Sequence, residues 1–222
     1  MVKKVVLFGA GDFARELIWV IEEINARAAV NKSGPVFEVA GIVDEDLAKK
    51  GSNIMGFPVY GSLKPAAFWA TQGESIYALC AVGRAVSRNN LMAKATELGY
   101  NYFNLIHPEA VVSGYAELKS GVIVMPGSII TVGVKIGEQV LINKLCSIGH
   151  DSVIGKDCTL APGVIVGGHA VIEEGCDIGM NASILPYVRI KRNSTIGAGA
   201  VVNKDLPADC TAVGVPAKII SR

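Results

Sequence analysis

The hydrophobic positions in the second half of the chain recur every six residues. From Val112 to Val202 all sixteen positions at this spacing are aliphatic, without an insertion. The residue four positions after each aliphatic residue is Ala, Val, Ser or Cys in fifteen of the sixteen cases. Glycine often stands one or three positions after the aliphatic residue. The pattern predicts a solenoid of short strands with aliphatic side chains inside, small residues at crowded inner positions and glycine at the corners. Three strands would form one coil of about 18 residues, which predicts roughly five coils.

The first hundred residues follow a different rhythm, in which apolar runs of strand length alternate with amphipathic stretches of helix length. Strands are expected at 4–8, 37–46, 75–82 and 100–106, and helices from the turn GAGDFA to about residue 28 and at 84–99. Strand, glycine turn, helix and strand in this order predict a small Rossmann-like unit with a parallel sheet. Two domains are expected. Residues 1–106 form a domain of the α/β class, and residues 107–222 form a β-helix of the all-β class.

Composition and charge limit the partners. Half of the residues are hydrophobic, 18% are charged and the net charge is +1, which excludes disorder and leaves no field for nucleic acid or an anionic membrane. The chain has no run of 18 apolar residues, and its first residues lack the apolar core of a signal peptide. We therefore expect a soluble cytoplasmic protein that binds neither nucleic acid nor membrane.

The five cysteines predict no disulfide framework and no zinc site, because their number is odd and no C-x-x-C or Cys/His spacing occurs. Three of them (Cys146, Cys158 and Cys176) fall on the small inner positions of the repeat. They are interpreted as interior fillers.

The repeat, together with the closing stretch VGVPAKII at 213–220, resembles the hexapeptide-repeat acyltransferases over about residues 110–222. That resemblance implies a left-handed parallel β-helix. Some members of this superfamily are carbonic anhydrases or serve non-catalytic roles, so the repeat indicates the fold more strongly than the activity.

The glycine turn of the first half fits the G-x-G-x-x-A pattern that lets a helix N-terminus approach phosphates. Asp44 ends the second strand, about 33 residues further on, where a dinucleotide site requires an acid after about 20 residues. Two interpretations stay open at this point. The turn binds a nucleotide, or the glycines only make a tight connection between strand and helix.

Five stretches of the chain are similar to sugar O- and N-acetyltransferases of the sialic-acid, bacillosamine and perosamine type: LFGAGDFARE, AGIVDED, FPVYGSL, AVGR and GYNYFNLIHPEAVVS. In that family a Rossmann-like domain precedes the β-helix and binds a nucleotide-linked amino sugar instead of NAD. The resemblance implies substrate contacts at Gly11, Asp12, Phe13, Asp44, Glu45 and Gly83. This chain departs from the family at Asp12-Phe13, where many relatives have Gly-His. A phosphate would be repelled by Asp12, whereas Phe13 could stack on a base or sugar.

The stretch LCSIGHDSVIG places a histidine in the outward-facing part of its hexapeptide, two residues after Ile148. An acid beside an imidazole raises its basicity, and Asp151 is adjacent to His150. The pattern N-x-x-x-S-x-G-H-[D/E] matches the catalytic region of the sugar acetyltransferases. The match implies that His150 is the general base, Asp151 its orienting partner and Asn143 a positioning residue. A backbone N–H near Gly168 would stabilise the oxyanion.

The other histidines offer alternatives. Asp151 and His169 are 18 residues apart, so they should stack on successive coils, and Asp151 could serve either histidine. His169 is the second candidate for the base. The third histidine, His107, matches a junction position of the family and is interpreted as structural.

The resemblance also implies an acetyl-CoA donor bound between subunits of a homotrimer. The family positions for the pantetheine fall on Thr159, Gly168, Met180 and Ala198, although relatives often have histidine where Thr159 stands. Lys204, Lys218 and Arg222 are candidates for contacts to the CoA phosphates. No metal is expected in the site.

The predicted function is acetyl-CoA-dependent N-acetylation of a nucleotide-linked amino sugar, such as a UDP- or GDP-4-amino sugar, in surface glycan synthesis. The alternatives are O-acetylation of sialic acid or another sugar, an NAD-binding protein and a non-catalytic scaffold. A γ-type carbonic anhydrase needs three histidine ligands, whereas the predicted β-helix holds only His150 and His169 beyond the junction residue His107.

Overall fold

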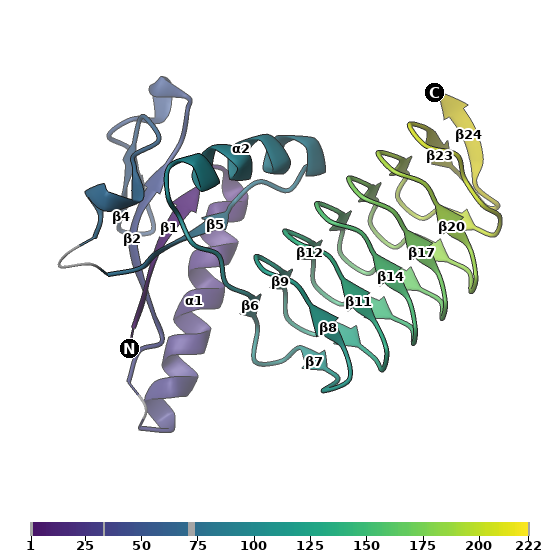
Figure 1. Ribbon diagram of the computed structural model, residues 1–222, viewed down its shortest axis with the longest axis horizontal. Helices are drawn as coiled ribbons and strands as arrows, with labels where there is room; N and C mark the ends of the chain where they lie inside the picture. Colours follow the sequence, from purple (N-terminus) through teal and green to yellow (C-terminus); the bar gives the residue numbers. More distant parts are fainter. Residues whose placement is uncertain (1, 33, 71–73, 222) are drawn as a thin grey trace. The chain divides into compact units, whose positions relative to one another are not determined.

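The protein is described by a computed structural model that covers residues 2–32, 34–70 and 74–221. Two compact units are present (Figure 1): one comprises Met1–Gly83 and Ser87–Phe103, the other Arg84–Val86 and Asn104–Arg222. Each unit has its own hydrophobic core. Among the described residues, no helix has the length and apolar character that crossing a membrane requires.

The first unit is a five-stranded sheet in the order β3-β4-β2-β1-β5. All neighbours in it are parallel except β3 and β4, which form a hairpin that the sequence analysis did not predict. The elements are β1 (Lys3–Phe8), α1 (Asp12–Val30), β2 (Phe37–Val43), a 3-10 turn (Leu47–Lys49), β3 (Asn53–Ile54), β4 (Phe57–Tyr60), a second 3-10 turn (Ala66–Phe68), β5 (Ile76–Cys80) and α2 (Ala85–Glu97).

Apolar runs explain why these segments form the core. Four consecutive residues of β1, Val5–Phe8, are fully buried, as expected for a central parallel strand covered on both faces. One stripe of α1 is buried, including Leu17, Ile18 and Ile21.

The predicted strand at 100–106 is wrong for most of its length. Only a bridge from Asn101 to Tyr77 and the two residues of β6 (Leu105–Ile106) pair, and β6 belongs to the second unit. Alternating aromatic residues produced the strand-like pattern, but their rings serve the core: Tyr100 packs against Phe8 with ring centroids 4.9 Å apart.

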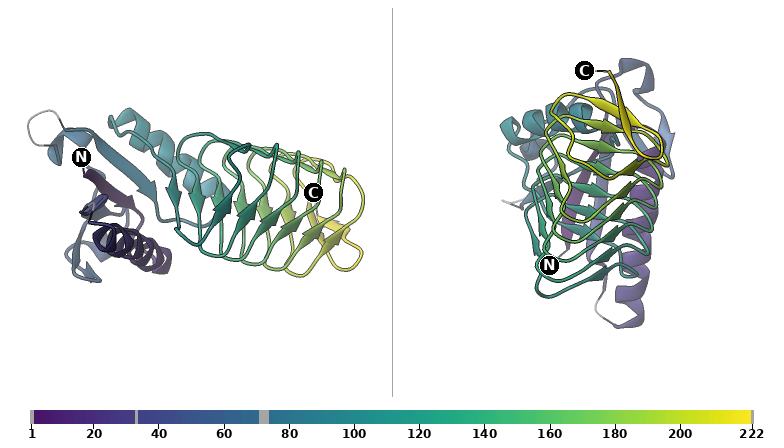
Figure 2. Two further views of the ribbon diagram at one scale, coloured as in Figure 1. Left: turned by 90° about the horizontal axis from the view of Figure 1, so that it is seen from below. Right: turned by 90° about the vertical axis from the view of Figure 1, so that its right-hand side faces the viewer.

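The second unit is a parallel β-helix with three faces, whose coils are stacked as Figure 2 shows. Strand pairing joins residues 18 apart, as in Ile130 with Ile148, so the predicted coil length is confirmed. The first face holds β7 (Val111–Val112), β10 (Ile129–Ile130), β13 (Ser147–Ile148), β16 (Ile165–Val166), β19 (Ser183–Ile184) and β22 (Val201–Val202). The second holds β8 (Glu117–Leu118), β11 (Lys135–Ile136), β14 (Val153–Ile154), β17 (Val171–Ile172) and β20 (Arg189–Ile190). The third holds β6, β9 (Ile123–Val124), β12 (Leu141–Ile142), β15 (Thr159–Leu160), β18 (Asp177–Ile178), β21 (Thr195–Ile196), β23 (Thr211–Val213) and β24 (Lys218–Ser221).

The interior follows the predicted period of six. From Val124 onward every aliphatic repeat position is buried, and so are the small residues four positions later, including Cys146, Cys158 and Cys176. Only the first coil, at Val112, Ala116 and Leu118, is partly open. The interpretation of the three cysteines as interior fillers is confirmed.

The corners have a shared backbone conformation. The third residue after the aliphatic position has a positive φ at nearly every corner, and it is glycine at some corners and a larger residue at others. Asp151 (φ 58°), His169 (φ 58°) and Tyr187 (φ 66°) are three of these larger residues. Left-handed backbone costs a non-glycine residue roughly 1–2 kcal/mol, so the coils maintain these corners against a local penalty.

Candidate functional site

One column of corners, between the first and second faces, stacks Gly133, Asp151, His169 and Tyr187 at intervals of 18 residues. We call these four residues the histidine column. His150 precedes Asp151 at the same corner. Its backbone carbonyl accepts a hydrogen bond from the His169 amide at 2.9 Å, which holds the two corners together.

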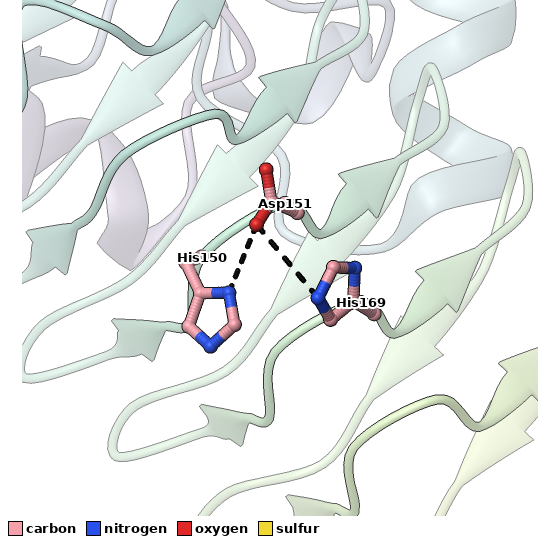
Figure 3. A group of neighbouring side chains, drawn as sticks. All are labelled: His150, Asp151 and His169. Atoms are coloured by element: carbon pink, nitrogen blue, oxygen red, sulfur yellow. Dashed lines mark hydrogen bonds and ion pairs between the residues drawn. The ribbon is translucent and has the colours of Figure 1, made fainter.

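Side chains from two successive corners, His150 and His169, both turn a ring nitrogen toward one carboxylate oxygen of Asp151 (Figure 3). Asp151 Oδ2 lies 2.9 Å from His150 Nδ1 and 3.8 Å from His169 Nε2. All three side chains are accessible, with exposed fractions of 58% for His150, 51% for Asp151 and 42% for His169. The hydrogen bond therefore goes to His150, while His169 remains within ion-pair distance of the same oxygen.

Glycines make room for this arrangement. A Cβ on Gly168 would lie 2.7 Å from His150 Nε2, so the imidazole lies directly over Gly168. A Cβ on Gly149 would lie 2.7 Å from the Gly168 backbone nitrogen, so the close stacking of these two coils requires glycine at position 149. Gly168, expected near the oxyanion and the pantetheine, is thus placed against the candidate base.

Aromatic contacts order the rest of the column. The ring of His169 stacks on Tyr187 at 4.9 Å with an interplanar angle of 10°, and it meets His150 edge-on at 5.0 Å and 90°. Sequence reasoning missed Tyr187. The signal that would have found it is the same 18-residue interval that predicted the stacking of Asp151 and His169.

The other residues expected at this site lie elsewhere in the chain. Asn143 is at the preceding corner, between the third and first faces, where its Oδ1 accepts the Lys144 amide at 2.8 Å. Met180 and Ala198 lie at corners of that same column, and Thr159 is on the third face in β15. Within one chain, the structure does not bring these four residues to His150.

Two further residues are unsuited to the chemistry. Burial raises the pKa of Cys146 to about 11, so its thiol is protonated and a poor nucleophile. His107 is buried, and its Nδ1 accepts the Glu109 amide at 3.1 Å.

The first unit contains a second candidate site at the carboxyl ends of its parallel strands. A cavity of about 330 Å³ lies there, lined by Gly9, Asp44, Glu45, Val82, Ser87, Asn90, Leu91 and Lys94. The last four come from α2 at spacings of three and four residues, which is one face of a helix. Sequence reasoning predicted this helix but not its contribution to the cavity.

Asp44 accepts three hydrogen bonds within its own unit. Its Oδ2 accepts the Ala10 amide at 2.7 Å and Lys49 Nζ at 2.8 Å, and its Oδ1 accepts the Asp46 amide at 2.8 Å. Burial by itself would raise the pKa of Asp44, but the hydrogen bonds from Lys49 and the two amides outweigh it and hold the pKa below its usual value. Asp44 thereby fixes the glycine turn to the end of β2.

Gly9, Gly11 and Gly83 differ in whether the fold requires glycine at their position. Gly9 has φ +110°, and a Cβ there would lie 2.9 Å from Val82 Cγ2, so the fold itself needs this glycine. A Cβ added to Gly11 or to Gly83 would meet no atom within 4 Å. The fold gives no steric reason for glycine at either position.

The other residues predicted to contact the substrate do not lie together in the first unit. Glu45 lines the cavity and pairs with Lys94 at 2.6 Å. Asp12 borders a different hollow of about 480 Å³, with Arg15, Glu16, Trp19 and Met55. Phe13 is partly buried at the start of α1.

Comparison with known proteins adds relatives of the same architecture. Residues 133–168 and 169–204 match the family model described as bacterial transferase hexapeptide (six repeats). A perosamine N-acetyltransferase from Caulobacter crescentus, solved as a histidine variant with CoA and GDP-perosamine, is 33% identical, with 100% of this chain and 99% of that chain covered and a TM-score of 0.84. The acetyltransferase domain of PglB from Neisseria gonorrhoeae FA1090 is 28% identical, with 98% of this chain and 100% of that chain covered and a TM-score of 0.80.

Curated sequences match over a shorter stretch. A serine acetyltransferase from Synechococcus elongatus is 49% identical over 41 residues, which are 18% of this chain and 17% of that protein. The chain thus spans less than a fifth of the length of the curated relatives it matches. The whole-chain similarities confirm the predicted fold class, a Rossmann-like parallel-sheet domain followed by a left-handed β-helix.

Proposed function

The chain belongs to the hexapeptide-repeat sugar acetyltransferases, and on that basis we propose that it transfers an acetyl group from acetyl-CoA to the amino group of a nucleotide-linked amino sugar. The observation that carries the mechanism is the 2.9 Å hydrogen bond between His150 Nδ1 and Asp151 Oδ2 on an accessible corner of the β-helix. The Caulobacter relative, solved with CoA and GDP-perosamine, supports the substrate class.

His150 serves as the general base. When Nδ1–H donates a hydrogen bond to Asp151, the proton of the neutral ring stays on Nδ1, and the lone pair of Nε2 can accept a proton from the attacking amine. The amine attacks the thioester carbonyl, the C–S bond breaks, and the imidazolium returns its proton to the CoA sulfur. Asp151 keeps the tautomer and stabilises the positive charge that develops on the ring.

The substrate binds in the cavity at the carboxyl ends of β1 and β2. Gly11 and Gly83 leave open space above the backbone, which suits the approach of a diphosphate to the start of α1. The carboxylate of Asp44 already accepts three hydrogen bonds. It therefore positions the turn and is less suited to the ribose of a dinucleotide, which favours the nucleotide sugar over NAD.

A homotrimer completes the site in this proposal. The outward side chains of the first face include exposed apolar residues (Val111, Ile129 and Ile165), which suit association with another copy. His150 and Asn143 lie at opposite ends of this face, so a neighbouring subunit would bring its Asn143, Met180 and Ala198 toward His150. The pantetheine would lie there, with Thr159 and Gly168 and the charges of Lys204 and Lys218 nearby. Arg222, the third candidate for the CoA phosphates, lies outside the described residues. The cytoplasmic location and the role in surface glycan synthesis belong to the same proposal.

The test is release of CoA from acetyl-CoA in the presence of a panel of GDP-, UDP- and dTDP-linked 4-amino sugars, with sialic acid as a hydroxyl acceptor. Turnover with one amino sugar, lost in His150→Ala, is the expected result. Turnover with sialic acid alone would replace the acceptor by an O-acetylation substrate. Equal turnover by His150→Ala would contradict the role of the histidine.

A further inference from the structure

The proposed acetyl transfer by His150 and Asp151 assigns no role to His169, although its Nε2 faces the same carboxylate. We propose that His150, Asp151 and His169 form a binding site for a divalent transition-metal ion of the zinc type, and that an ion bound there switches off the general base. The binding site stands on the geometry alone, whereas the inhibition rests on the proposed function.

The three side chains have the composition and spacing of a metal site. One ligand atom from each lies within 4.8 Å of the others, and Asp151 Oδ2 is 2.9 and 3.8 Å from the two imidazole nitrogens. A tetrahedral zinc ion with ligands at 2.0–2.2 Å holds its ligand atoms about 3.4 Å apart. Small rotations of exposed side chains bring the three atoms to that spacing, since Figure 3 shows both rings turning a nitrogen toward the same oxygen.

The backbone under these ligands is held in place. The Asp151 amide donates to the Val132 carbonyl at 3.0 Å, and the His169 amide donates to the His150 carbonyl at 2.9 Å. Stacking on Tyr187 orients the His169 ring before any ion arrives. Binding therefore requires only side-chain adjustment, which keeps the entropic cost low.

The ligand set also selects the ion. Two imidazoles and one carboxylate suit zinc, cobalt and related ions, and leave a fourth position for water, whereas magnesium and calcium prefer sites made of oxygen ligands. In the single chain, all three side chains are more than two-fifths exposed.

An ion bound at this site would change which ring nitrogen of His150 carries the proton, and His150 would no longer act as a base. A neutral imidazole carries one proton, which His150 keeps on Nδ1 when it donates to Asp151. A metal ion bound at Nδ1 would take the place of that proton, and a neutral ring would then carry its proton on Nε2. Nε2 then donates a hydrogen bond and can no longer accept a proton from the amine.

The binding experiment uses the wild-type protein without substrates. Titration with Co²⁺ should produce visible absorption bands of a nitrogen- and oxygen-ligated ion, and Zn²⁺ should displace them while Mg²⁺ should not. Loss of a residue that only supports a metal ligand already costs about tenfold or more in affinity. Loss of the ligand itself in His169→Gln should therefore weaken Co²⁺ binding by at least about tenfold. Tyr187→Phe is the matched control from the same column and should bind Co²⁺ nearly as the wild type does. Equal affinity of His169→Gln, or bands of thiolate ligation from the buried cysteines, would overturn the proposal.

A second experiment measures inhibition, following loss of the thioester absorbance so that no thiol reagent competes for the metal. Zn²⁺ should inhibit the wild type and a chelator should restore turnover, while His169→Gln should need at least about tenfold more Zn²⁺. Asp151→Asn, tested for Co²⁺ binding only, gives a second answer should His169→Gln fail to fold. An inactive but metal-binding wild type would refute the proposed function and leave the site intact. Equal inhibition of wild type and His169→Gln would show that the ion acts elsewhere.

Discussion

Two aspartates, each beside a candidate site, illustrate how differently the two units use the same residue. Asp44, at the end of β2, has a side chain that is 14% exposed and accepts hydrogen bonds from two backbone amides and Lys49. Asp151, at a β-helix corner, is 51% exposed and meets only imidazoles among the ion pairs and side-chain hydrogen bonds found in the described residues. A carboxylate that is held by backbone amides and a lysine stabilises the fold, whereas one that faces an accessible imidazole can take part in chemistry.

The same contrast separates the two units. The first unit shapes its cavity with the glycine turn, one face of α2 and a carboxylate that is held by three hydrogen bonds. The second unit displays accessible side chains on a rigid stack of coils. Substitutions at Asp44 should therefore change stability first, and those at His150 should change turnover without changing stability.

The largest effect is expected for His150→Ala. Loss of a general base should lower kcat by about 10²- to 10⁴-fold, while an exposed substitution should change the free energy of unfolding by no more than about 0.5 kcal/mol. Initial rates and chemical denaturation of the same preparation measure both quantities. A large loss of stability would place His150 with Asp44 and remove the contrast.

Asp44→Ala tests the other side of the comparison. It leaves the Ala10 amide and Lys49 without their acceptor, so the free energy of unfolding should fall by about 1–3 kcal/mol. Denaturation monitored by tryptophan fluorescence is suitable because both tryptophans, Trp19 and Trp69, lie in the first unit. Unchanged stability combined with loss of turnover would make Asp44 a catalytic or substrate-binding group.

The β-helix was predictable from the sequence, because the period of six requires aliphatic and small side chains at the same positions of every coil. The interval of 18 residues also placed Asp151 beside His169. The state of Asp44 was not predictable, since its partners Ala10 and Lys49 come from separate connections that meet only in three dimensions. The segment 100–106 failed for a related reason: apolar alternation does not distinguish a strand from rings packed into a core, such as Tyr100 and Phe103.

A matched pair of glycine substitutions separates fold from binding within the turn. Gly9→Ala should cost about 1 kcal/mol or more, because alanine is strained at φ +110° and meets Val82. Gly11→Ala should lower stability less than Gly9→Ala does, because its Cβ points into open space and its φ is −97°. If the substrate diphosphate approaches here, Gly11→Ala should raise KM several-fold with kcat nearly constant. An unchanged KM would remove Gly11 from the binding site.

The smallest effect concerns acid. The pKa of Asp44 is lower in the folded than in the unfolded protein, so its contribution to stability is present above the unfolded value of about 3.9 and is lost as the pH falls through the folded value. The stability difference between wild type and Asp44→Asn should therefore shrink as the pH is lowered from neutral to below about 4. A difference that stays constant over this range would mean that the ionised carboxylate is not what holds the turn.

The central claim is that Asp151 acts through His150, and a double-mutant cycle on turnover tests it most directly. Rates are measured for the wild type, Asp151→Asn, His150→Ala and the double variant with the accepted amino sugar. Asp151→Asn should lower kcat by at least about tenfold when His150 is present and should have no further effect when it is absent. An equal loss in both backgrounds would show that the two residues act independently and would contradict the account.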